Sequence, residues 1–91
     1  MDNLINLLYE ILGRTINKRD LIVEFQRKIS DYEPSKEEYK IYNLLNDLAL
    51  DLDYYEPNPE WRKEDPSFYG DDKLEEEIRT ALEKIERIRK K

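Results

Sequence analysis

Carboxylates are the groups in this chain most able to do acid–base chemistry. The chain has 22 Asp and Glu residues but no histidine and no cysteine. These absences exclude disulfides, zinc sites with Cys or His ligands, thiol nucleophiles and proton transfer by histidine. Any reaction or metal site would therefore depend on oxygen atoms, chiefly those of carboxylates.

Two groupings could form a carboxylate pair: Asp51 with Asp53, and the run Glu75-Glu76-Glu77. Such a pair acts as a general acid only when burial or a neighbouring charge raises one pKa. Groups at loop ends and helix starts are solvated, which opposes that shift. Successive helical residues also point about 100° apart, so the three glutamates do not converge. We therefore expect no enzymatic activity and no catalytic residues.

A hard-cation site is a second chemical option. Calcium loops place oxygen ligands at alternate positions around a glycine turn, in a loop of about twelve residues. The sequence around Gly70 has Asp71 and Asp72 but lacks that spacing. The simpler interpretation is that Gly70 makes a turn and Asp72 caps a helix. We expect no metal and no cofactor, and keep a carboxylate metal-binding protein as a third hypothesis for function.

Acidic and aromatic residues are concentrated in one part of the chain. Residues 51–77 carry 11 acids and 3 bases, whereas the whole chain carries 22 acids and 16 bases. Such a segment repels nucleic acids and anionic membranes and attracts basic protein surfaces. The alternative is that the acids only keep a small protein soluble. The aromatics in or beside the same segment favour a protein interface: Tyr54, Tyr55, Trp61, Phe68 and Tyr69.

These residues must be positioned by helices, because apolar residues recur at offsets of three and four along most of the chain. We expect helices over about 2–12, 18–31, 35–53 and 73–89. Gly13 is expected to end the first helix in the left-handed conformation, and Ser35 with Glu38 forms a capping box before the third. The sequence predicts an all-α fold, a small four-helix bundle forming a single domain over residues 1–91.

Residues 55–71 form a long, acidic loop, rich in Pro and aromatic residues, between the third and fourth expected helices. It contains three of the four prolines, and its apolar residues do not recur at helical spacing. Connections between bundle helices usually have about 2–8 residues, and long ordered loops are often functional. No apolar run approaches the roughly 20 residues of a membrane span, and no signal-peptide pattern opens the chain. The expected location is therefore cytoplasmic.

Two stretches of the chain have distinctive patterns. Residues 52–60 read Leu-Asp-Tyr-Tyr-Glu-Pro-Asn-Pro-Glu, and residues 69–84 form an acidic turn followed by a helix of the form Leu-x-x-Glu-x-Arg-x-x-Leu-Glu-Lys. Both stretches resemble the colicin D immunity protein family. The first half is similar too, with a Leu/Ile-rich helix, a short break and a helix carrying Phe25. The resemblance covers most of the chain.

This resemblance implies an acidic, all-helical immunity protein that binds the nuclease domain of a tRNA-cleaving toxin one to one. From the capped amphipathic helices and the acidic charge we also expect the protein to be monomeric when free and to contact no nucleic acid directly. The family's toxin-contacting acids fall at Asp53, Glu56 and position 58, where this chain has Asn58. Either Glu60 supplies the missing charge or the partner differs. The expected toxin-binding residues are Asp53, Tyr54, Tyr55, Glu56, Asn58, Glu60, Trp61, Asp71 and Asp72.

A different hypothesis uses the same acidic surface. The chain could be a helical adaptor or regulatory subunit that binds another basic protein unrelated to toxins. A toxin gene next to its own would separate the two hypotheses, and calorimetry with calcium, magnesium or manganese would test the metal-binding one.

Overall fold

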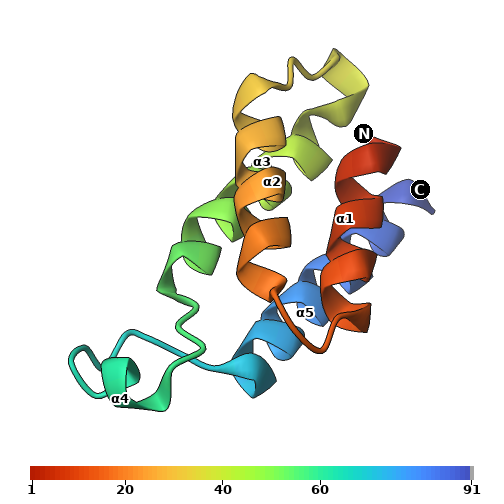
Figure 1. Cartoon of the computed structure of the whole chain (residues 1–91). Coiled ribbons are helices and arrows are strands. Elements are labelled where there is room, and N and C mark those ends of the chain that lie inside the picture. Colours follow the sequence, from red (N-terminus) through yellow and green to blue (C-terminus); the bar gives the residue numbers. More distant parts are fainter. Residues whose placement is uncertain (91) are drawn as a thin grey trace.

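The computed structural model describes residues 1–90, which are mostly helical and contain no strand. Figure 1 shows the arrangement of the five α-helices. The α-helices are α1 (Asp2–Gly13), α2 (Lys18–Asp31), α3 (Tyr39–Asp51), α4 (Pro59–Arg62) and α5 (Asp71–Arg89). Two short 3-10 helices, Lys36–Glu38 and Leu52–Tyr54, lie directly before and after α3.

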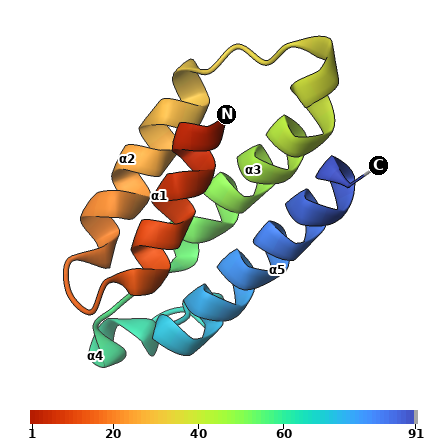
Figure 2. The ribbon, with the colours of Figure 1, turned by 90° about the vertical axis from the view of Figure 1, so that its right-hand side faces the viewer.

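The four long helices share one apolar core. α1 packs on α2, α2 on α3, and α5 packs on both α3 and α1 (Figure 2). Each of the four contributes a side chain with no exposed surface: Leu8, Phe25, Leu45 and Ile78. No polar or charged residue is buried within residues 1–90. We call α1, α2, α3 and α5 together the helical body.

Local signals explain where the middle helices begin and end. α2 has the bounds that its apolar periodicity predicts. The capping box before α3 is confirmed: Ser35 and Glu38 bond reciprocally, with the Ser35 amide donating to Glu38 Oε1 at 3.0 Å. The Tyr32 hydroxyl also donates to Glu38 Oε2 at 2.7 Å. Backbone and hydroxyl hydrogen bonds hold the pKa of Glu38 below its usual range.

Two expected helix ends are wrong. Gly13 is the last residue of α1 and no glycine has a positive φ, so the left-handed turn that we expected there is absent. The left-handed residue is Asn17, with φ 57°, directly before α2. α5 begins at Asp71, with Gly70 as its N-cap, so Asp72 lies inside the first turn and is not the cap.

The expected loop between the third and fourth long helices is not wholly irregular. It contains α4, and Tyr55 and Tyr69 form an isolated parallel bridge. Among residues 1–90, no helix has the combination of length and apolar character that a membrane span requires.

Candidate protein-binding surface

The connection from α3 to α5 closes on itself through backbone hydrogen bonds. The Tyr69 amide donates to the Tyr54 carbonyl at 3.0 Å, and the Glu56 amide donates to the Tyr69 carbonyl at 2.8 Å. We call residues 56–68, which lie between these bonds, the arm. Figures 1 and 2 place its helix, α4, at the end of the molecule where α3 ends and α5 begins.

Tyr55 fastens one side of the arm's base. Its ring is buried, its hydroxyl donates to Asp71 Oδ1 at 2.6 Å, and its carbonyl accepts from Arg19 Nη1 at 2.6 Å. Lys18 Nζ lies 3.6 Å from the same Asp71 oxygen. The Tyr55 hydrogen bond, with help from Lys18, lowers the pKa of Asp71. Burial, followed by the Asp71 carboxylate, raises the pKa of Tyr55.

Tyr69 fastens the other side. Its hydroxyl hydrogen is shared between the Asp51 carbonyl, at 2.9 Å, and Asp51 Oδ2, at 3.1 Å. Burial raises the pKa of Tyr69, and the Asp51 charge adds to that shift. The two tyrosine rings lie with centroids 6.4 Å apart. Four residues from α3, α5 and the bridge thus hold the arm at a fixed place on the helical body.

These bonds change the expected roles of two candidate residues. Tyr55 is only 3% exposed, so it anchors the arm and has no free face for a partner, contrary to our expectation. Asp71 is also engaged in the anchor, although its side chain remains 63% exposed. Asp72 is exposed and lines a shallow hollow together with Arg62, Gly70 and Lys73.

Two expected contact residues present large free surfaces. Trp61 on α4 is 58% exposed and Tyr54 is 45% exposed. Asp53 is exposed as well, and its Oδ1 accepts a 2.7 Å hydrogen bond from Gln26 Nε2. Glu56 is half-buried at the start of the arm. Aromatic area and carboxylates are thus available together at this end of the molecule.

Asn58 has a structural role in the arm. Its Oδ1 accepts from the Glu60 amide at 2.9 Å, which makes it the N-cap of α4, and Pro59 occupies the first helical position. Asn before Pro suits a helix start, because Asn satisfies a free amide and Pro needs no amide partner. This pair is the sequence signal for α4, a helix too short to show apolar periodicity. Glu60 is exposed and pairs with Lys63 at 3.5 Å.

Arg62 turns back from α4 towards the start of α5. Its guanidinium occupies the place that a Cβ atom on Gly70 would take. Its charge contributes to the lowered pKa of Asp71. One of the two bases on the arm is therefore drawn towards the helical body, while Glu60 and Glu64 remain exposed.

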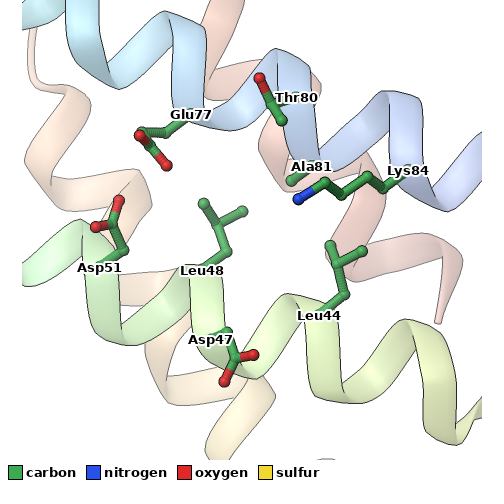
Figure 3. Close-up of a pocket in the computed structure, with 8 residues that line it drawn as sticks. All are labelled: Leu44, Asp47, Leu48, Asp51, Glu77, Thr80, Ala81 and Lys84. Carbon is green, nitrogen blue, oxygen red and sulfur yellow. The ribbon is translucent and has the colours of Figure 1, made fainter.

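The structure brings together a carboxylate pair that differs from both pairs suggested by the sequence. Asp51 and Glu77 point toward one another across a groove between α3 and α5 (Figure 3). Burial raises the pKa of Asp51, and Glu77 adds to the shift. Both groups already have partners, because Tyr69 bonds Asp51 and Lys73 pairs with Glu77 at 3.2 Å. The groove, of about 280 Å³, is lined by Leu44, Asp47, Leu48, Asp51, Glu77, Thr80, Ala81 and Lys84.

Members of the two groupings that the sequence offers, Asp51 with Asp53 and Glu75 with its neighbours, are bound to other partners. Asp53 is bonded by Gln26 of α2, whereas Asp51 faces α5. Glu75 instead pairs with Arg79 at 2.7 Å. Within residues 1–90, no group of three or more acidic side chains is placed to hold a metal ion. What this end of the molecule offers is an exposed, acidic and aromatic surface on an anchored arm.

Comparison of the chain with protein-family models, with curated proteins and with solved structures finds no match in any of the three.

Proposed function

We propose that this protein is a non-enzymatic immunity protein that binds and inhibits a tRNA-cleaving bacterial toxin. The helical body, as a four-helix bundle, would carry the arm and the end of α3 into the basic active-site cleft of the nuclease domain. The observation that supports this most is the exposure of Trp61 on the anchored arm and of Tyr54 at its base, together with the exposed carboxylates of Asp53, Glu60 and Glu64.

Electrostatics supports a basic partner. A cleft that binds tRNA is lined by cations, and residues 51–77 carry 11 acids and 3 bases. Opposite charges speed the encounter of two proteins and fix their orientation. Carboxylates of Asp53 and Glu56 would stand where RNA phosphates lie, and block the substrate without any reaction.

Exposed aromatic area supports a tight complex. A nuclease inhibitor must bind at nanomolar affinity or better, which corresponds to about −12 kcal/mol. Charge alone does not supply that, because both partners lose hydration when they meet. Trp and Tyr bury about 150–250 Å² each and are the residues most enriched in interface hot spots. Trp61 and Tyr54 are placed to provide this area.

The resemblance of residues 52–60 and 69–84 to colicin D immunity proteins supports the same partner class. The positions that it marks, Asp53 and Glu56, lie at the base of the arm. Asn58 departs from the family pattern, and its role as the α4 cap gives a local reason for an amide there. The protein would act as a monomer in the cytoplasm of the cell that makes it, with one copy per toxin domain.

The test uses the nuclease domain encoded directly upstream of this chain's gene and a tRNA-cleavage assay. The double variant Asp53→Lys with Glu56→Lys should weaken inhibition at least a hundredfold. Its lysines repel the cleft, and the cationic groups of the partner are left buried without partners, at a cost of about 2–5 kcal/mol. The matched control is Glu83→Lys with Glu86→Lys, two exposed residues of α5 towards its far end.

Circular dichroism should show both double variants folded. Equal inhibition by the two would mean that the inhibitory surface lies elsewhere. Failure of the parent protein to bind or inhibit the nuclease would overturn the proposed function and leave an adaptor for another basic protein as the alternative.

A further inference from the structure

Trp61 is the single tryptophan of the chain, and it is exposed on α4, which lies outside the packed helices of the helical body (Figure 1). α4 has only four residues, and none of the residues of the arm is buried. Isolated helices of this length are unstable in water. α4 is therefore held by its cap and by the anchored ends of the arm, rather than by packing of Trp61.

The arm is pre-organised for insertion. The two ends of the arm are joined by the bridge between Tyr55 and Tyr69. The hydroxyls of these two tyrosines are hydrogen-bonded to Asp71 and Asp51, respectively. Arg19 adds a 2.6 Å bond to the Tyr55 carbonyl. A loop that already has its bound shape loses little conformational entropy on binding. This favours rigid entry into a pocket over folding around a partner.

The charged residues next to Trp61 indicate what kind of pocket on a partner would bind it. Glu60 and Glu64 are exposed on either side in sequence, Lys63 is paired with Glu60, and Arg62 is turned back onto Gly70. Two exposed carboxylates therefore lie within three residues of Trp61 in the sequence, while Arg62, the base next to it, is folded back towards α5. The complement of such a tip is an apolar pocket that carries Arg or Lys, which attracts both the ring face and the carboxylates.

We infer that the arm is a preformed plug whose Trp61 enters a pocket of the nuclease partner lined by Arg or Lys side chains. Trp61 then sets affinity more than any single carboxylate does, and Gly70, which has no side chain, leaves room for Arg62 to fold back from Trp61 towards the start of α5. This inference rests on the proposed function and deepens it. It assigns the dominant contact to α4, outside the two acidic positions marked by the resemblance.

The first test uses the intrinsic fluorescence of Trp61. Adding an excess of the upstream-encoded nuclease domain, in a variant with no tryptophan, should shift the Trp61 emission to shorter wavelength and protect it from acrylamide. Trp61→Ala should weaken binding at least about thirtyfold, the loss typical of a hot spot, while Trp61→Phe keeps most of the affinity. The matched control is Tyr39→Ala, which removes a 51% exposed ring at the opposite end of α3.

The second test concerns the seat of Arg62. Gly70→Ala places a methyl group where the guanidinium lies, and the flexible Arg62 side chain must move out. The freed cation should slow association about three- to tenfold through repulsion by the basic partner. Adding Arg62→Gln to Gly70→Ala should restore the rate. A rate that stays low in the double variant would contradict the role assigned to Gly70.

The outcomes separate the two proposals. If the nuclease is bound and inhibited, but Trp61 emission is unchanged and Trp61→Ala binds like Tyr39→Ala, the inference is overturned and the proposed function stands. If the parent protein neither binds nor inhibits the nuclease, both are overturned.

Discussion

In the helical body, side chains of α1, α2, α3 and α5 meet in a continuous apolar core, whereas the arm has no buried residue. The arm is held by hydrogen bonds at its base, two of them from tyrosine hydroxyls to aspartates. Apolar burial scales with area and supplies most of the folding free energy, while a polar bond contributes little net energy but fixes a geometry. The body therefore sets stability, and the anchors set the position of the arm.

The strongest way to test this difference is to place a charge in the core. Leu48 is 6% exposed on α3 and Ile78 is fully buried on α5. Leu48→Asp or Ile78→Asp should unfold the chain, because burying an unpaired carboxylate costs several kcal/mol and a small domain has about 5–10 kcal/mol of stability. Thermal melting followed by circular dichroism measures this. Glu83→Ala, at an exposed position of α5, is the control and should melt like the parent.

Helix α5 also shows that apolar spacing alone does not predict how deeply a residue is buried. Leu82 also fits the apolar stripe of α5, but it is only half-buried, because Ala81 and Ile85 take the inner positions. Leu82→Asp should therefore destabilise less than Ile78→Asp. Equal loss of melting temperature would mean that Leu82 belongs to the core.

The four long helices and the capping box before α3 could be predicted from the sequence because their causes are local. The bounds of α2 and the reciprocal bonds of Ser35 and Glu38 depend on residues within one turn of each other. The anchors depend on the fold. Arg19 reaches the Tyr55 carbonyl across 36 residues, and no spacing rule connects them. For the candidate surface, the sequence placed Trp61 and Tyr55 in or beside the loop, but that Trp61 is exposed and Tyr55 buried became known only from the fold, in which Tyr55 and Tyr69 form a bridge.

The anchors of the arm should respond differently from the core. Tyr55→Phe keeps the buried ring but removes the hydrogen bond to Asp71, so the free energy of unfolding should fall by about 1–2 kcal/mol. Hydrogen exchange should become faster at the amides of Glu56 and Tyr69, which close the bridge. Tyr9→Phe, on an exposed ring of α1, is the control. Uniformly faster exchange throughout α1 and α2 would contradict a local role.

The capping box before α3 lies far from the arm, so weakening it should affect stability without affecting the arm. Ser35→Ala removes the side-chain half of the capping box and should lower stability by about 1 kcal/mol. Ser35 precedes α3 whereas the arm follows it, so exchange at Glu56 and Tyr69 should stay unchanged beyond the global loss of stability. A specific loosening of the bridge in Ser35→Ala would show that the arm and the body are coupled along α3.

The smallest effects should come from the two aspartates that anchor the arm, and they should have opposite signs. The pKa of Asp71 is lowered in the folded chain, chiefly by the Tyr55 hydroxyl. Its ionised form therefore stabilises the fold above its ordinary pKa, and this contribution is lost as the pH falls through the lowered value. The pKa of Asp51 is raised, chiefly by burial. Its ionisation destabilises the fold as the pH rises from the ordinary to the raised value.

Replacing each aspartate by asparagine separates these contributions, because the amide oxygen still accepts a bond from the tyrosine hydroxyl. At pH 7, Asp71→Asn should lower the free energy of unfolding and Asp51→Asn should raise it, each by under about 1 kcal/mol. Both differences should shrink as the pH falls below about 4, where carboxyl groups become protonated. Urea unfolding at pH 7 and pH 3 measures them. If both variants lose stability at pH 7, Asp51 anchors the arm as a favourable charge, and its proximity to Glu77 costs the fold nothing.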